Sequence, residues 1–214
     1  MNPYDGVIFD YGNVLSREQD VQLIAQMADE LNCDIAQFEH CYWAYRPQYD
    51  SAAIDGIQYW GLIASDLGIQ LQSSSIRRLI DLDNASWSIA NEVIVGCAER
   101  LRKQGTKTAI LSNMPADLRW QLSENCAWLP RFDQETYSCE IHLTKPDPAI
   151  YSHCLKGLRT EPARTLFIDD RLPNVEAARN LGLQTIHFLT TAQVVAELHS
   201  TFGWETYEKS IPTT

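Results

Sequence analysis

Four short apolar runs, separated by helical patterns, limit what this chain can fold into more than any other feature. Each run is continuous in apolar residues rather than alternating, which is typical of parallel strands that helices cover on both faces. The runs are GVIFD (6–10), TKTAILSN (106–113), RTLFIDD (164–170) and LQTIHFL (183–189). Helical patterns follow the second and third runs, and another precedes the second. This alternation predicts an α/β fold with a doubly wound, Rossmann-like parallel sheet.

Residues 17–90 interrupt this alternation and predict an all-helical insert. One apolar stripe at helical spacing stands out there, formed by Ile57, Trp60, Ile63, Ala64 and Leu67. We therefore expect two domains, a core of residues 1–16 and 91–214 and a small helical cap of residues 17–90 that covers the strand ends. The last residues, 205–214, are expected to be a loosely held end.

Polar side chains stand at the ends of three of the predicted strands. Asp10 ends the first, Ser112 and Asn113 end the second, and Asp169 and Asp170 end the third. In open α/β sheets, ligands bind beyond the carboxyl ends of the strands, which meet at one edge. These side chains are therefore expected to be neighbours, although they are far apart in the sequence.

Carboxylates that meet in this way repel one another unless a cation lies between them. Oxygen ligands without a His or Cys partner favour Mg²⁺. Lys145, before a helix expected to begin at Pro148, and Asn174, on a helix expected to begin at Pro173, can reach the same edge. A cation, a lysine, a hydroxyl and a helix N-terminus together form a phosphate pocket. A free carboxylate there is a candidate nucleophile on phosphorus.

On these residues the chain resembles the haloacid dehalogenase (HAD) superfamily, in particular its phosphatases with a helical cap inserted after the first strand. Four motifs occur in the family's order: FDYGNVL (9–15), LSNMP (111–115), TKPDPAIY (144–151) and FIDDRLPNVEAARNLG (167–182). FDYGNVL together with DDRLPN is similar to a subgroup that includes sugar 1-phosphate phosphatases and the N-terminal domain of soluble epoxide hydrolase. The resemblance implies a Mg²⁺-dependent phosphomonoester hydrolase that acts on a sugar phosphate or another small phosphorylated metabolite through an aspartyl-phosphate.

The resemblance also implies catalytic roles. Asp10 would be the nucleophile, and Ser112 would hold a phosphate oxygen. Asn113 would help to orient the phosphate or the nucleophile. Lys145 would neutralise the charge that the nucleophile and the phosphoryl group share.

The implied metal ligands are Asp10, Asp170 and the backbone carbonyl of Gly12. Asp169 and Asn174 would support them through hydrogen bonds or metal-bound water. In the cap, Arg46 and Trp43 lie where they could contact a substrate, although an Arg–aromatic cluster is more often interdomain packing.

Gly12 departs from the pattern of most phosphatases of this family, which carry a second Asp there as general acid and base. Such catalysis is typically worth about 10²–10⁴-fold. Three explanations are open. The substrate has a good leaving group, as in a sugar 1-phosphate; another residue, such as Tyr11, Asp169 or a cap group, supplies the proton; or the protein is a poor phosphatase. We favour the first.

Two alternative functions remain open on the sequence. A metal-independent 2-haloacid dehalogenase uses the same nucleophile and also lacks the second Asp, so Gly12 does not exclude it. A catalytically silent member would bind a phosphorylated ligand without turnover. The pair Asp169 and Asp170 favours a metal site and therefore phosphate chemistry.

Composition limits the remaining classes of function. The 214 residues carry a net charge of −11, which argues against a nucleic-acid surface. No apolar stretch approaches the roughly 18 residues of a membrane span. The six cysteines are scattered, and the first strand leaves no room for a signal peptide. We therefore expect a cytoplasmic monomer or homodimer with reduced cysteines, no nucleic-acid or membrane partner, and a small phosphorylated metabolite as its ligand.

Overall fold

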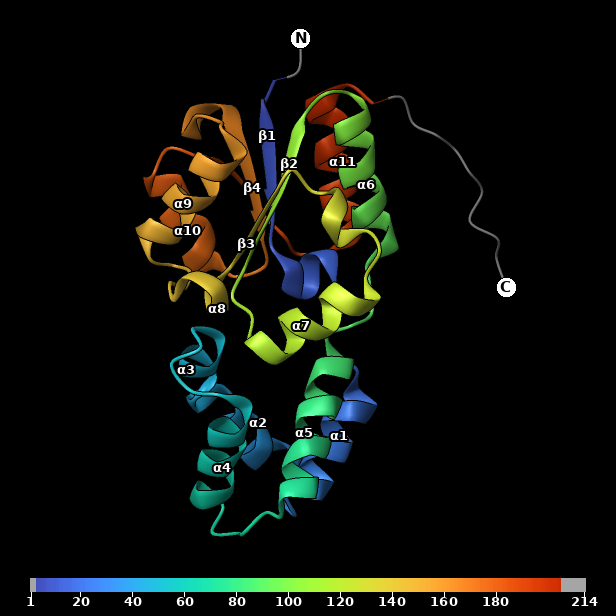
Figure 1. The fold of residues 1–214 in the computed structure, drawn as a ribbon. Coiled ribbons are helices and arrows are strands. Elements are labelled where there is room, and N and C mark those ends of the chain that lie inside the picture. The colour runs from blue at the N-terminus through green and yellow to red at the C-terminus, as the bar shows by residue number, and fades with distance from the viewer. Residues whose placement is uncertain (1–2, 205–214) are drawn as a thin grey trace, which may run out of the picture.

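The computed structural model describes residues 3–204, in which five parallel strands form one sheet (Figure 1). The strand order is β3-β2-β1-β4-β5, so β1 lies at the centre between β2 and β4. In this register Val7 is paired with Thr108 on one side and with Leu166 on the other. The strands are β1 (Gly6–Phe9), β2 (Lys107–Ser112), β3 (Gln134–Tyr137), β4 (Thr165–Asp169) and β5 (Gln184–His187).

Helices cover both faces of this sheet, as the continuous apolar runs predict. In Figure 1, α9 and α10 lie on one side of the strands, and α6 and α11 lie on the other. Neighbouring residues of β1 serve the two faces, because Val7 and Phe9 join one buried cluster and Ile8 joins another. The helices of this part are α6 (Glu92–Lys103), α7 (Ala116–Asn125), α8 (Ser138–Ile141), α9 (Pro148–Leu158), α10 (Leu172–Asn180) and α11 (Thr191–Phe202).

The remaining helices gather beyond the carboxyl ends of the strands, at the lower end of Figure 1. They are α1 (Val21–Glu30), α2 (Ile35–Ala44), α3 (Arg46–Asp50), α4 (Gly56–Asp66) and α5 (Ser73–Ser86). They have a hydrophobic cluster of their own, with Trp60 and Ile63 fully buried in it. The chain enters and leaves this part side by side, because Ser16 and Ala90 form an antiparallel bridge. The arrangement supports the proposed division into a core (1–16 and 91–214) and a cap (17–90).

The four predicted strands are confirmed, with their ends shifted by one or two residues. The edge strand β3 was not predicted, because its sequence QETY contains no apolar run and, within residues 3–204, it pairs with β2 alone. The helices α3, α8 and α11 were also not predicted. In the predicted apolar stripe, Trp60, Ile63 and Ala64 are buried, but Ile57 is exposed. The predicted loose end at 205–214 lies outside the described residues.

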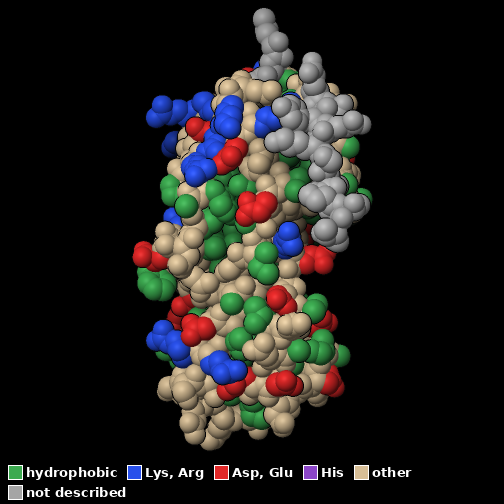
Figure 2. All heavy atoms as spheres, turned by 90° about the vertical axis from the view of Figure 1, so that its right-hand side faces the viewer, with side chains coloured by type: hydrophobic (Ala, Val, Ile, Leu, Met, Phe, Trp, Pro, Cys, Tyr) green, Lys and Arg blue, Asp and Glu red, His purple; other side chains and the backbone are tan. Residues whose placement is uncertain are grey.

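Positive and negative side chains are interspersed on the face that Figure 2 shows. No helix in the described part of the chain has the length and hydropathy of a membrane span. All six cysteines are unpaired, and four of them are buried.

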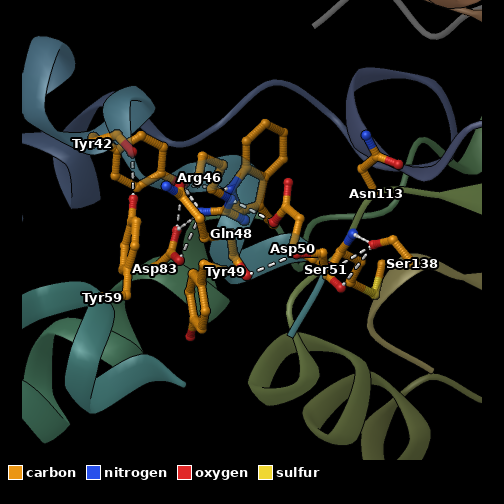
Figure 3. A network of polar contacts seen from close by, with 12 residues as sticks. Tyr42, Arg46, Gln48, Tyr49, Asp50, Ser51, Tyr59, Asp83, Asn113 and Ser138 are labelled. Carbon is orange, nitrogen blue, oxygen red and sulfur yellow. Dashed lines mark hydrogen bonds and ion pairs between the residues drawn. The ribbon is translucent and has the colours of Figure 1, made fainter. Parts of the chain in front are cut away.

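A buried ion cluster fixes the part of the cap that faces the core (Figure 3). The Nε of Arg46 donates to Oδ1 of Asp50 at 2.8 Å, and the Nη1 of Arg46 contacts Oδ2 of Asp83 at 3.0 Å. The guanidinium also lies over the rings of Tyr42 and Tyr49, 5.1 and 5.6 Å from their centroids. Arg46, Asp50 and Asp83 are all buried. Because α2, α3 and α5 each contribute to the cluster, it holds these helices together.

Replacing Arg46 by Met is expected to destabilise the fold by about 3–5 kcal/mol, because it leaves the buried carboxylate of Asp83 without its cation and the buried side chain of Asp50 without its hydrogen-bond donor. The measurement is urea unfolding followed by circular dichroism. Arg78→Met is the matched control, since this arginine is exposed and pairs with Glu30 at 3.3 Å. The control should lose less than about 1 kcal/mol. Equal losses of unfolding free energy in the two variants would show that the buried cluster stabilises the fold no more than an exposed ion pair does.

Candidate active site

The ends of β1, β2 and β4 meet at a pocket of about 290 Å³ between the core and the cap. The core side of this pocket includes Asp10, Ser112 and Lys145. From residues 17–90 come Trp43, Arg46, Asp50 and Trp87. The structure thus brings together residues from both ends of the chain, as the position of the strand ends predicts. The volume suits a small molecule.

Asp10 follows the central strand directly and is 7% exposed. Its Oδ1 accepts a hydrogen bond from the backbone N–H of Tyr11 at 2.6 Å and contacts Nζ of Lys145 at 2.7 Å. Burial raises the pKa of Asp10 well above its ordinary value; Lys145 opposes this shift, and the neighbouring Asp169 and Asp170 add to it. Asp10 is therefore a carboxylate whose charge depends on the cations placed around it.

Lys145 lies between Asp10 and Asp169, with its Nζ 2.7 Å from a carboxylate oxygen of each. Burial alone would lower the pKa of this ammonium, but the two carboxylates outweigh burial and raise it. The side chain of Asn113 makes two hydrogen bonds to the backbone of Lys145. Its Oδ1 accepts from the N–H of Lys145 at 2.8 Å, and its Nδ2 donates to the Lys145 carbonyl at 2.9 Å. The structure thus uses the amide of Asn113 to position Lys145.

Asp169 is fully buried, and both of its oxygens are engaged. Besides Lys145, they accept from Nδ2 of Asn174 at 3.0 and 3.1 Å and from the backbone N–H of Arg171 at 2.8 Å. Asn174 thus faces back toward the strand end from the first turn of α10, at the place that the sequence predicts for it. Asp169 acts as an anchor for Lys145 and Asn174.

Asp170 lines the same pocket as Asp10. Its Oδ2 accepts from Nδ2 of Asn13 at 2.8 Å, and burial raises its pKa, against the effect of that hydrogen bond. One carboxylate oxygen each from Asp10, Asp169 and Asp170 lies within 4.8 Å of the others. Three carboxylates and one lysine leave an excess of negative charge in a partly buried place. Such a donor set fits a divalent cation of the Mg²⁺ type.

Ser112 is buried at the end of β2 and lines the pocket, with its Oγ 3.3 Å from the carbonyl of Asn113. This contact is long for a hydroxyl hydrogen bond, so the hydroxyl is available to a ligand oxygen. Ser112 and Lys145 are therefore positioned to bind an anion beside Asp10.

At Gly12 a side chain would meet Trp87. A Cβ built on this glycine lies 3.4 Å from the indole ring, whereas its backbone angles (φ −62°, ψ 131°) are ordinary. The hydroxyl of Tyr11 donates to the backbone carbonyl of Trp87 at 2.9 Å, and the Trp87 Nε1 donates to the hydroxyl of Tyr42 at 3.1 Å. A side chain at position 12 would therefore begin in ordinary van der Waals contact with the ring of Trp87.

The two cap residues predicted to contact substrate differ in whether their side chains already have polar partners. Arg46 lines the pocket, but its guanidinium is bound to Asp50 and Asp83. Trp43 lines the pocket and is 48% exposed, so its ring remains available. Contact of either residue with a substrate stays a prediction.

Four further residues that line the pocket were not predicted from the sequence: Asn13, Asp50, Trp87 and Arg171. For Asp50 a signal exists, since Arg46 and Asp50 are four residues apart, the spacing of a helical ion pair. For Trp87 none exists, because the same residue fits a helix core equally well.

Similarity to known proteins gives a second, independent indication of what this site does. Residues 4–182 match the family model described as haloacid dehalogenase-like hydrolase. A 145-residue stretch is 32% identical to the pig (Sus scrofa) bifunctional epoxide hydrolase 2 and covers 65% of this chain. That stretch spans only 26% of the length of the relative.

Two further matches concern a phosphatase and a solved structure. A sesquiterpene phosphatase from Aspergillus oryzae is 34% identical over 103 residues, which are 48% of this chain and 53% of the relative. A HAD family enzyme from Bacteroides thetaiotaomicron was solved as a mutant in complex with magnesium and inorganic phosphate. It superposes with a TM-score of 0.70 at 17% identity, over 86% of this chain and 93% of that one. At this identity the superposition shows a shared fold.

Replacing Lys145 by Met leaves Asp10 and Asp169 facing each other without a cation and is expected to cost about 3–5 kcal/mol near neutral pH. The loss should shrink as the pH falls. The pKa of Asp10 in the folded chain is above its unfolded value, and more so without Lys145, so the folded state takes up a proton first and is stabilised.

The measurement is urea unfolding of both proteins in chelator, between about pH 7 and pH 5. Lys156→Met, at an exposed position of α9, is the control and should lose less than about 1 kcal/mol at any pH in this range. A difference from the parent protein that stays constant with pH would contradict the proposed repulsion.

Proposed function

The chain belongs to the haloacid dehalogenase-like hydrolases, and from this premise we propose that it is a Mg²⁺-dependent phosphomonoester hydrolase that acts through an aspartyl-phosphate. The observation that carries the proposal is the position of Asp10. It lies buried at the end of the central strand, 2.7 Å from Lys145, with Asp169 and Asp170 beside it. The phosphatase among the matched relatives, and the magnesium and phosphate bound to the structural neighbour, support the same reaction class.

The metal would be held by a carboxylate oxygen of Asp10, by Asp170 and by the backbone carbonyl of Gly12. When bound, Mg²⁺ supplies positive charge that draws a phosphate oxygen to the site and offsets the repulsion between the acids. The two acids of this donor set fit, because one carboxylate oxygen of Asp10 and one of Asp170 lie within 4.8 Å of each other. Asn13 orients Asp170 from the turn that follows β1.

The phosphoryl group would lie over Asp10, with one oxygen bound to the hydroxyl of Ser112 and another to the ammonium of Lys145. In the first step a carboxylate oxygen of Asp10 attacks phosphorus, and the bond from phosphorus to the alcohol oxygen breaks. In the second step water attacks the aspartyl-phosphate and releases inorganic phosphate. Lys145 lowers the repulsion between the approaching anions in both steps, because it stays fixed between two carboxylates and the Asn113 amide.

The substrate proposed is a small phosphorylated metabolite, such as a sugar phosphate. The pocket is of small-molecule size, and the aromatic side chains of Tyr11, Trp43 and Trp87 form part of its wall. Rings of this kind stack on the apolar faces of sugars as well as on other organic groups.

Asp10→Asn is expected to remove activity by more than about 10⁴-fold, as is typical when a covalent nucleophile is replaced. The measurement is release of inorganic phosphate from a panel of phosphate esters in the presence of Mg²⁺. Asp81→Asn, an exposed position of α5, is the matched control and should keep full activity. Retained turnover in the Asp10 variant, with an unchanged circular dichroism spectrum, would exclude the mechanism.

Removal of Mg²⁺ by a chelator should abolish phosphate release. Added Mg²⁺ should raise the melting temperature of the parent protein, because it neutralises the acid cluster, and this shift should be lost in Asp170→Asn.

Two other outcomes would replace the proposal. Hydrolysis of 2-haloacids that persists in chelator indicates a dehalogenase, and phosphate esters that stabilise the fold without turnover indicate a silent binding protein.

A further inference from the structure

The proposed reaction lacks an evident proton donor for the departing alcohol, because Gly12 has no side chain. Two of the substitutes considered on the sequence are already engaged. The hydroxyl proton of Tyr11 is donated to the carbonyl of Trp87. Asp169 is fully buried with both oxygens bound to Lys145, Asn174 and a backbone N–H.

We propose that Asp50, which the cap brings into the pocket, is the general acid that protonates the leaving alcohol oxygen. This inference rests on the proposed phosphatase function and completes it. Asp50 is the last residue of α3 and lines the pocket together with Asp10, Ser112 and Lys145. It also lines the adjoining hollow with Asn113 and Lys145.

The position of Asp50 is fixed from both domains. Its carbonyl oxygen accepts from Oγ of Ser138 at 2.5 Å, and the same Oγ accepts from the backbone N–H of Met114 at 2.9 Å. Met114 follows the strand-end pair Ser112 and Asn113, so one short chain of hydrogen bonds ties Asp50 to the core beside the phosphate pocket. In Figure 3, Asp50 lies between Arg46 on the cap side and Ser138 on the core side.

One carboxyl oxygen of Asp50 is engaged and the other is open. Oδ1 accepts from Nε of Arg46 at 2.8 Å, whereas Oδ2 makes no hydrogen bond to any residue between 3 and 204. The side chain as a whole keeps 12% of its surface accessible, although the residue is buried. The open oxygen can therefore carry a proton and present it to a ligand in the pocket.

The charges around Asp50 leave burial as the dominant influence. Burial raises the pKa of its carboxyl; Arg46 and Arg171 oppose the shift, and Asp83 adds to it. Tyr59 and Cys139 also interact electrostatically with the carboxyl, and burial raises the pKa of each of them. A carboxyl with a raised pKa in the wall of the reaction pocket is the usual form of a general acid.

The location also agrees with the direction in which the alcohol must leave. In phosphoryl transfer the leaving oxygen lies opposite the attacking oxygen across phosphorus. Asp10 attacks from the strand end in the core, so the leaving oxygen points toward the cap. Asp50 is a carboxyl that the cap contributes to this pocket.

The proton balance of the two steps is complete. When the phosphorus–oxygen bond to the alcohol breaks, its electron pair stays on the alcohol oxygen, which takes the proton from Asp50. The resulting Asp50 carboxylate is stabilised by Arg46. In the second step this carboxylate accepts a proton from the water that attacks the aspartyl-phosphate, and Asp50 is again protonated when phosphate is released.

The test uses Asp50→Asn and two classes of phosphate ester. An alkyl phosphate needs a proton on its leaving oxygen, whereas p-nitrophenyl phosphate leaves as a stable anion. With the alkyl ester we expect kcat/KM to fall by about 10²-fold or more, and with the aryl ester by less than about threefold. Asp83→Asn is the matched control, because it also pairs with Arg46 but does not line the pocket. Asp83→Asn should change both esters by the same factor.

Equal losses on the two esters in Asp50→Asn, or no loss on either, would overturn the assignment. A second measurement uses the unaltered protein, so it does not depend on how well the variant folds. Its kcat/KM should vary little with the acidity of the alcohol across a series of esters, and a steep dependence would exclude a general acid. Failure of the phosphatase proposal is distinct, because the unaltered protein would then release phosphate from no ester at all.

Discussion

The ammonium of Lys145 between Asp10 and Asp169 is the contact on which the rest of the site depends. The two acids end neighbouring strands of the sheet, β1 and β4, and both are buried. Two charged carboxylates cannot persist in such a place without a cation between them. Other hydrogen bonds therefore fix the position of Lys145. The amide of Asn113 binds the backbone of Lys145, and Asn174 donates to Asp169, which in turn binds the ammonium.

A second buried cation repeats this arrangement in the cap. Arg46 holds Asp50 and Asp83, just as Lys145 holds Asp10 and Asp169, and the pocket lies between the two clusters. The two clusters differ in what they leave open. In the core one, Lys145 limits the charge of a nucleophile; in the cap one, Arg46 satisfies a single oxygen of Asp50. The site is thus enclosed by acids whose charge is set by their immediate partners rather than by water.

The central part of the fold and the core of the site could be predicted because their signals are local. A continuous apolar run followed by Asp10, or by Asp169 and Asp170, indicates both a strand and its chemistry. The edge strand β3 carries no such run, and α11 was missed although its Thr190 and Gln193 form a capping box. On the cap side of the pocket, Trp43 and Arg46 were predicted, but Asp50 and Trp87 were missed, for a different reason. Which cap side chains face the strand ends depends on how the two domains pack, and the helical spacing of Arg46 and Asp50 indicates only that these two residues can pair.

The central position of β1 in the sheet has a consequence for synthesis. Its first residue, Gly6, pairs with Lys107 and with Thr165, so both neighbours of β1 lie about a hundred residues or more downstream. The whole of the helical insert leaves the ribosome before either of them. During synthesis, the apolar residues of β1 therefore stay without their strand partners until β2 and β4 have been made. The segment VIF (7–9) is the one that a chaperone would need to shield during this time.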